Sequence, residues 1–518
     1  MYIRRSLAVL ALGLGLTLLL LLALNSPPQK THAWPMPTPG STRPPGPAFV
    51  KVGGTGDWCL QDDPCGSIQY ALEQCEPGNG DTIYVAGGTY TGTGGAVITV
   101  TKSVTLYGGW DGTTTTPVVR DPDAYPTTLD GQGARRVVYI TGPATVTLEG
   151  LTVANGETIS TTATGWDGPG LYARDAALTL RHTKFYSNVV DVYDYDAADS
   201  YAYGGGACVE GGTLQVYTST FWANSARARR SSEGGGMAIS GTLIATVTGS
   251  LFQDNRAWDG SGLYFLGESG DHAPLILSDS IFVDNHGGYA GALMAINAQA
   301  QIEGNLFRTN RASNDYGAVS VFYSDLSLTG NVITGNQCGR TSGLHLYHVS
   351  PFTVTNNIIA GNETFYTWRI YPAVEVRYGS GRFLHNTVAR NESFYGVEVA
   401  DGAAVALTNT IVASHTVGIT VTAGSTATLY HTLFYANSSG DTGGPGTIVN
   451  SSPITGQDPR LTADYHLGCG SPAIDAGVDA GVTTDIDGDA RPHDGGYDVG
   501  ADEFYGWCTY LPLVWKSD

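Results

Sequence analysis

The sequence is poor in charged residues, in basic residues above all, and in the patterns that predict helices. Only 14% of its 518 residues are charged, with 26 Lys and Arg against 47 Asp and Glu. This acidic excess argues against nucleic acid and anionic membrane surfaces as partners. Long amphipathic helical patterns are nearly absent, whereas 70 glycines and many Thr, Ser, Val and Tyr residues indicate an all-β chain with many turns.

Cysteine is also scarce, and none of its spacings resembles a zinc site. Five of the seven cysteines lie towards the two ends of the chain: Cys59, Cys65, Cys75, Cys469 and Cys508. These positions permit disulfides at both ends, as expected outside the cell, but do not fix their pairing. Cys208 and Cys338 stand alone among the repeats, so we expect them to be buried thiols.

A long apolar run at the N-terminus is predicted to direct export. Two arginines precede the apolar stretch 7–24, and cleavage after Ala33 makes residues 1–33 a signal peptide. An uncleaved membrane anchor is the alternative, and it is the only membrane contact that we expect. Removal of this basic segment lowers the net charge from −21 to −24. A Pro-rich linker is predicted at 34–50.

A short motif recurs through the middle of the chain, as in "SIFVDN", which ends at Asn285. Ten units align without an internal gap, and their closing residues, 22 to 36 positions apart, are Asn188, Asn224, Asn255, Asn285, Asn310, Asn336, Asn362, Asn391, His415 and Asn437. The third position before the closing residue is Phe, Ile or Val, and the fifth is Ser, Thr or Asn. This alternation predicts two short strands with a bend between them.

A third short strand follows the variable segment of each unit, for example "GGGMAIS" at 234–240. Three short strands per repeat predict a parallel β-solenoid, whose coils stack about 4.8 Å apart. Equivalent residues of successive units therefore form columns, and we expect the Phe and Ser of the motif to face inward. The closing Asn is predicted to turn a corner in the left-handed conformation, because Gly156 and His415 replace it in equivalent units. Its amide can also hydrogen-bond along the column.

With these motifs the chain resembles the right-handed parallel β-helix family, the pectate-lyase-like solenoids, over roughly residues 66–460. The resemblance implies an all-β, single-stranded, right-handed parallel β-helix of about 12 coils. The segment "GSIQYALEQCEPGNGDTIYV" resembles the start of such proteins, which implies a helical cap at about 67–74 over the open end of the core. The segment 464–504 resembles the C-terminal part of secreted proteins of the choice-of-anchor type.

The expected organisation therefore has five parts: a signal peptide at 1–33, a linker at 34–50, an N-terminal cap with the first coils at 51–110, β-helix repeats at 111–460 and a C-terminal segment at 461–518.

The variable segments emerge on one side of the solenoid and are rich in aromatic residues. Aromatic faces with polar neighbours suit sugar rings, and a long stacked surface suits a polymer. The alternative is that these aromatic side chains only pack against one another. The expected binding residues are Trp258, Asp259, Tyr289, Tyr316, Tyr366 and Trp368.

One charged patch could also carry chemistry, because charged residues flank the closing Asn on successive coils. A lyase acting on uronic-acid polymers needs a positive charge near the carboxylate and a base. A hydrolase needs two carboxyl groups roughly 5–10 Å apart. A solvated turn with compensating charges explains the same pattern. The candidate catalytic residues are Asp254, Asp284, His286, Arg256, Arg311 and Asp315.

A second acidic pattern lies near the C-terminus, where Asp485, Asp487 and Asp489 alternate like the first acids of a calcium loop. Ala490 stands where an EF-hand loop needs Gly, and Gly496 stands where it needs Glu. We therefore expect a tight turn, with calcium as the alternative and no other cofactor.

The expected function is non-catalytic binding of a glycan or another surface by a secreted or cell-surface monomer. The chain has none of the local signatures of pectate lyases or polygalacturonases, and a shared fold does not carry an activity. The alternative is an extracellular polysaccharide lyase or glycoside hydrolase. In both cases the expected partner is a polysaccharide or cell-surface glycan, and not a nucleic acid.

Overall fold

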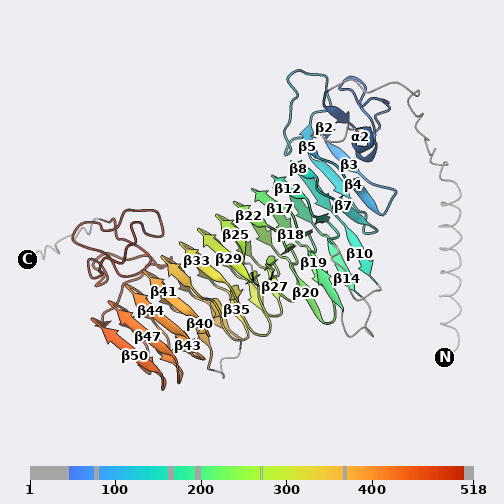
Figure 1. Cartoon of the computed structure of the whole chain (residues 1–518). Helices are drawn as coiled ribbons and strands as arrows, with labels where there is room; N and C mark the ends of the chain where they lie inside the picture. The colour runs from blue at the N-terminus through green and yellow to red at the C-terminus, as the bar shows by residue number, and fades with distance from the viewer. Residues whose placement is uncertain are drawn as a thin grey trace, which may run out of the picture. The chain divides into compact units, whose positions relative to one another are not determined.

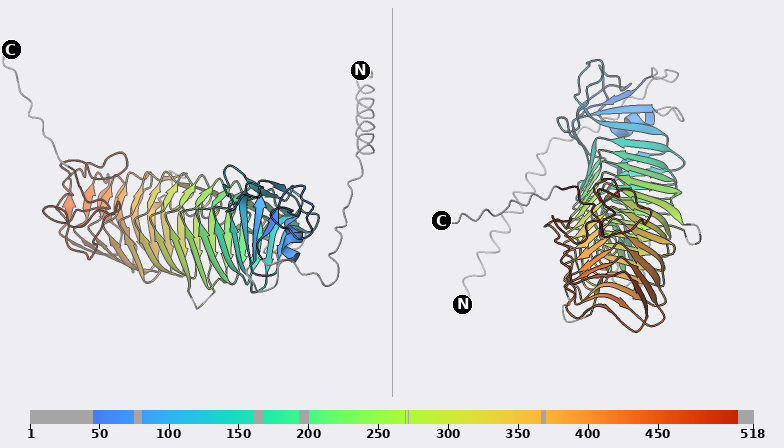
Figure 2. Two further views of the ribbon diagram at one scale, coloured as in Figure 1. Left: turned by 90° about the horizontal axis from the view of Figure 1, so that it is seen from above. Right: turned by 90° about the vertical axis from the view of Figure 1, so that its left-hand side faces the viewer.

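The chain forms a parallel β-helix built from three long sheets. The structure, a computed structural model, describes residues 46–74, 81–160, 168–192, 200–268, 270, 272–365 and 370–506. Within these residues the three sheets contain 13, 15 and 14 strands, and we call them sheets I, II and III in the order in which a coil enters them. Figure 1 shows sheet II running from β2 (Asp81–Ala86) to β50 (Thr447–Ser451), and Figure 2 shows the coils stacked as successive rungs.

Each coil gives one strand to each sheet. In the coil that contains "SIFVDN", β24 (Leu263–Leu266) lies in sheet I, β25 (Ala273–Ser278) in sheet II and β26 (Ile281–Val283) in sheet III. The short strand β27 (His286–Gly287) follows, and β28 (Leu293–Ile296) begins the next coil. Both β24 and β26 pair in parallel with their counterparts in the next coil, which confirms the predicted three-strand repeat.

The core contains a column of phenylalanine rings from sheet III. These inward-facing residues are fully buried and pair in register on successive coils: Phe185, Phe221, Phe252, Phe282 and Phe307. Neighbouring ring centroids lie 4.6 to 4.9 Å apart. Stacked aromatic pairs each contribute about 0.5–1.5 kcal/mol beyond the area that they bury. The predicted inward column is therefore confirmed.

The closing Asn is part of a buried hydrogen-bonded ladder. Asn285 has no exposed surface, and its Nδ2 donates to Asn310 Oδ1 at 2.9 Å and to the carbonyl of Phe252 at 2.8 Å. The prediction that this Asn adopts the left-handed conformation is wrong, because that conformation falls on the residue before it. Positive φ angles occur at Ser187, Ala223, Asp254, Asp284, Thr309 and Arg390. The corner residue points outward, so the following Asn can turn its amide into the stack.

A second ladder lies at the bend between sheets II and III. Asn305 Nδ2 donates to Asn331 Oδ1, Asn331 Nδ2 to Asn357 Oδ1, and Asn357 Nδ2 to Asn386 Oδ1, each at 3.0 Å. The predicted hydrogen bonding along the column of closing residues is thus confirmed, and a second ladder that was not predicted lies at the other bend. Because each amide satisfies backbone groups inside a turn, the ladders fix the register between coils.

The N-terminal end of the core is covered by α2 (Ile68–Gln74), close to the helix predicted at 67–74. Its buried side chains Ile68, Ala71 and Leu72 belong to the main core cluster. Strand β1 (Ala48–Val50) pairs with β2, so the first strand begins within the stretch expected to be a linker. A disulfide joins Cys59 to Cys65. The predicted signal peptide and most of the linker lie outside the described residues.

The C-terminal segment folds back over the outer face of sheet III. Its apolar residues Leu461, Leu467, Ala473 and Val499 pack against Ala389, Ile411, Ala413 and Leu433 of that face. Cys469 is disulfide-bonded, and Cys208 and Cys338 are buried thiols, as expected. Within the described part of the chain, no helix has the length and apolar character needed to span a membrane.

Candidate functional site

The predicted charged patch forms a column on the corner that follows sheet III. Arg256 pairs in register with His286, and His286 with Arg311, on three successive coils. Together with Trp258 and Ser313 they line a shallow depression of about 470 Å³. We call Arg256, His286 and Arg311 the cationic column. The register of the coils thus brings together residues that lie up to 55 positions apart in the sequence.

The acidic residues of the patch have partners. Asp254 Oδ1 lies 3.5 Å from Arg256 Nη2 and 4.0 Å from His286 Nε2. Asp284 Oδ1 accepts a hydrogen bond from Thr309 Oγ1 at 2.6 Å. The third candidate acid, Asp315, lies in a turn, and its backbone carbonyl oxygen accepts hydrogen bonds from the N–H groups of Arg340 and Thr341 in the next coil. The charge of Asp254 is therefore compensated by Arg256, whereas Asp284 is held by a neutral hydroxyl, so the two corner carboxylates have different surroundings.

The positive charge of the column comes from its two arginines. Burial, followed by the neighbouring Arg256, lowers the pKa of His286 below its usual value. His286 is therefore neutral at neutral pH, and its imidazole adds hydrogen-bonding capacity instead of charge. The guanidinium of Arg311 lies 4.6 Å from the centre of the Phe365 ring, which holds it beside the depression.

Aromatic side chains lie beside the column on the same coils. Trp258 is 40% exposed, and its ring meets Tyr289 edge-on at a centroid distance of 5.6 Å. Tyr289 lies 6.5 Å from Tyr316, so three of the predicted binding residues form one strip. The predicted residues Tyr366 and Trp368 lie outside the described residues.

Asp259 belongs to a buried pair of carboxyl groups. Burial raises the pKa of Asp259 to about 6 and that of Glu233, its partner on the preceding coil, to about 8. Ser231 Oγ donates to Asp259 Oδ2 at 3.1 Å, and Glu233 is only 6% exposed. Sequence reasoning missed Glu233. The sequence did contain a signal for it. Glu233 directly precedes Gly234 and Asp259 directly precedes Gly260, and each of these glycines lies just ahead of a strand of sheet I.

Replacement of Glu233 by Gln should stabilise the protein at alkaline pH. The pKa of Glu233 is raised from 4.5 to about 8 on folding, so the native state binds the extra proton between these values. Stability is therefore lost as pH rises through this interval, and a neutral amide avoids the loss. We expect the midpoint temperature of thermal unfolding of Glu233→Gln to exceed that of wild type at pH 8. The difference between the two midpoints should vanish at pH 4.5. An equal or lower midpoint at pH 8 contradicts the burial of this carboxyl.

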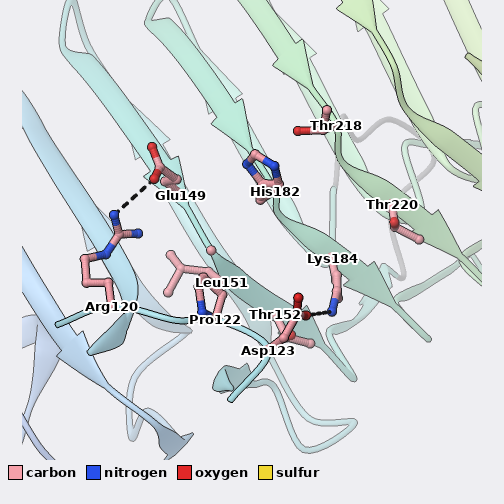
Figure 3. A pocket seen from close by; sticks show the side chains of 11 residues that line it. Arg120, Pro122, Asp123, Glu149, Leu151, Thr152, His182, Lys184, Thr218 and Thr220 are labelled. Atoms are coloured by element: carbon pink, nitrogen blue, oxygen red, sulfur yellow. Dashed lines mark hydrogen bonds and ion pairs between the residues drawn. The ribbon is translucent and has the colours of Figure 1, made fainter. Parts of the chain in front are cut away.

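A second cleft, which the sequence did not indicate, lies at the N-terminal end of sheet III (Figure 3). Residues 111–126 cross the outer face of the sheet, where Arg120 pairs with Glu149 at 3.1 Å and Asp123 with Lys184 at 3.2 Å. The cleft of about 410 Å³ is also lined by His182, Thr152, Thr218 and Thr220. Because its charges are paired with each other, the cleft offers mainly neutral hydrogen-bonding groups.

Two exposed aromatic rings lie on the same outer face. Tyr186 is 38% and Trp222 is 45% exposed, and their ring centroids are 4.7 Å apart. Both stand two positions before a closing Asn, which alternation assigns to the outer face of sheet III and not to the variable segments. The aromatic content of the variable segments therefore gives no indication of this pair.

Comparison with known proteins finds one family model that matches part of the chain. Residues 288–438 match the family model described as a right handed beta helix region. No curated protein matches the chain by sequence.

Three solved structures illustrate the structural likeness. Tailspike protein 3 of bacteriophage CBA120 shows a TM-score of 0.39 at 11% identity, covering 78% of this chain and 61% of its own. A pectate lyase shows a TM-score of 0.32 at 15% identity, covering 89% of this chain and 97% of its own. A lacto-N-biosidase from Eubacterium ramulus shows a TM-score of 0.28 at 10% identity, covering 79% and 68%. The chain thus spans less than two thirds of the tailspike.

Proposed function

We propose that this chain, a right-handed parallel β-helix in which Arg256 engages Asp254 and Thr309 engages Asp284, binds an acidic polysaccharide without cleaving it. The observation that carries the proposal is the cationic column, in which Arg256 and Arg311 flank a neutral His286 on three successive coils. The coils repeat about every 4.8 Å, so a polymer with regularly spaced carboxylates meets equally regular donors.

The chemistry of the depression suits such a ligand. Guanidinium groups form charge-assisted hydrogen bonds to carboxylates, and Arg presents its donors in a planar fork. The exposed face of Trp258 offers a surface for the apolar side of a sugar ring. In a chain with a net charge of −21, the guanidinium groups of Arg256 and Arg311 give an anionic polymer a local set of cationic hydrogen-bond donors.

We place this binding outside the cell. The predicted signal peptide at 1–33 supports export. The disulfide between Cys59 and Cys65 and the disulfide-bonded Cys469 support an oxidising compartment.

A polysaccharide hydrolase is the second candidate function, and one observation favours it. Glu233 and Asp259 lie on adjacent coils, and their pKa values are about 8 and about 6. Such a difference in pKa between two carboxyl groups is typical of a catalytic acid and base. The burial of Glu233 argues against it, because a polymer does not reach a side chain that is 6% exposed. Products released from acidic or neutral polysaccharides by wild type, and lost in Glu233→Gln, would establish the hydrolase and replace the binding proposal.

The binding proposal predicts weaker association when the column loses charge. We expect Arg256→Gln and Arg311→Gln each to lower the affinity for polygalacturonate about tenfold, which corresponds to about 1.4 kcal/mol. The measurement is a calorimetric titration at low and high salt, and the salt dependence should decrease in both variants. Because both arginine side chains are exposed, we expect both variants to fold, and circular dichroism checks this.

Two tryptophans provide a matched comparison. Trp258→Ala should weaken binding, whereas Trp222→Ala, an equally exposed ring on the outer face of sheet III, should not. The opposite pattern places the glycan beside the cleft of Figure 3 and contradicts a site at the cationic column.

A further inference from the structure

The turn that contains the predicted calcium ligands is closed by Asp485. Its Oδ1 accepts hydrogen bonds from the backbone N–H groups of Asp487 at 2.9 Å and Asp489 at 2.8 Å. Its Oδ2 accepts from the N–H of Glu503 at 2.9 Å. Because both oxygens are used by the backbone, Asp485 shapes the turn, and this role agrees with the tight turn expected from the sequence.

We propose that His466, Asp487 and Asp502 together form a divalent-cation site. One ligand atom from each of these residues lies within 4.8 Å of the others. They come from three parts of the C-terminal segment: His466 lies beside the isolated bridge between Leu461 and Leu467, Asp487 lies in the turn closed by Asp485, and Asp502 lies near the end of the segment. Sequence spacing could not group them, because the first and the last lie 36 positions apart.

The orientation of His466 is the second observation that points to a metal. Its Nδ1 lies 3.2 Å from the backbone carbonyl oxygen of Asp464, and its Nε2 lies 3.0 Å from Asp487 Oδ2. With its Nδ1 proton donated to that carbonyl, the ring turns Nε2 towards the carboxylates, where Nε2 holds a proton for Asp487 or, once that proton is released, a cation. Histidine ligands of metals are held in this way by a hydrogen bond from the other ring nitrogen.

Asp502 supplies a carboxylate that is largely removed from water. It is 7% exposed, and its Oδ2 accepts one hydrogen bond, from the Leu467 N–H at 2.6 Å. Two carboxylates close together are unfavourable unless a positive charge lies between them. A cation held by both would relieve this repulsion and would join the three parts of the segment.

The donor set indicates the class of ion. One imidazole nitrogen and two carboxylate oxygens suit Zn²⁺ or another first-row divalent ion, with water completing the coordination. Calcium prefers six to eight oxygen ligands, which this cluster does not supply. The site therefore differs from the calcium loop considered from the sequence, although Asp487 belongs to both.

The experiment uses the full exported chain after treatment with a chelator. We expect calorimetry to show one equivalent of Zn²⁺ bound, Ca²⁺ to bind at least tenfold more weakly, and Zn²⁺ to raise the midpoint of thermal unfolding. His466→Gln and Asp487→Asn should weaken Zn²⁺ binding about 100-fold. Asp489→Asn is the matched control, because it changes a carboxylate of the same turn outside the cluster and should leave binding unchanged.

Three results would overturn the proposal. The first is no uptake of Zn²⁺ by the folded protein. The second is preferential binding of Ca²⁺ that Asp489→Asn abolishes, which assigns the ion to the alternating acids. The third is full Zn²⁺ binding by His466→Gln, which removes the imidazole from the site.

Discussion

Replacement of Asn285 by Ala should lower the free energy of unfolding by about 3–5 kcal/mol, because it leaves several buried polar groups without partners. Asn285 Oδ1 accepts from both the N–H and the Nδ2 of Asn255, and its own Nδ2 donates to the Phe252 carbonyl. All of these groups lie in the dry interior of the stack, where water cannot replace them. Urea unfolding followed by circular dichroism measures the change.

The neighbouring Asp284 is the control for this prediction. Its φ angle of 53° is left-handed, and its side chain is exposed enough to remain solvated. Glycine adopts this conformation without steric strain, so Asp284→Gly should change stability by no more than about 1 kcal/mol in either direction. A loss at Asp284 equal to that at Asn285 would contradict the division of roles between corner and ladder.

Replacement of Arg491 by Ala should release the C-terminal segment from sheet III. Arg491 Nη1 lies 2.7 Å from Glu503 Oε2, both side chains are at most 1% exposed, and Nη2 donates to the Gly500 carbonyl at 2.9 Å. Removal of the guanidinium leaves a buried carboxylate without its counter-charge, a loss of about 3–5 kcal/mol. Hydrogen exchange should show rapid exchange of 461–506 while the coils remain protected.

Two further variants separate the ion pair from general damage. Arg491→Met combined with Glu503→Gln removes both charges and keeps one of the two oxygens that accept from the N–H groups of His493 and Asp498, so it should recover part of the protection. Arg460→Ala, at an exposed arginine directly before the segment, should have an effect within about 0.5 kcal/mol. Equal exchange in wild type and Arg491→Ala would show that the buried pair does not hold the segment.

The fold could be predicted because a solenoid repeats its pattern. The ten closing positions and the inward Phe and Ser columns fix the three sheets and the stacking of coils. The same pattern could not show which residue takes the left-handed φ. Asn favours both a left-handed corner and an amide ladder, and the true corner residues are as different as Ala223, Asp284 and Arg390. Only the backbone distinguishes the two.

The part of the candidate site that could be predicted is the part whose residues occupy equivalent positions in successive coils. The cationic column follows from counting one position past each closing residue. The pair of Glu233 and Asp259 and the cleft of Figure 3 were not predictable in this way. Glu233 lies in a segment of variable length, and the wall of the cleft comes from residues 111–126, which precede the aligned repeats. The cation-binding cluster depends on how the C-terminal segment folds, which no repeat specifies.

The most direct test of the account compares one polysaccharide in two forms, polygalacturonate and the same polymer with its carboxyl groups reduced to alcohols. Wild type should bind the acidic form and bind the reduced form at least about tenfold more weakly. The double variant Arg256→Gln/Arg311→Gln should bind both forms equally weakly. Equal affinity of wild type for the two forms would contradict the claim that the cationic column recognises an acidic polymer.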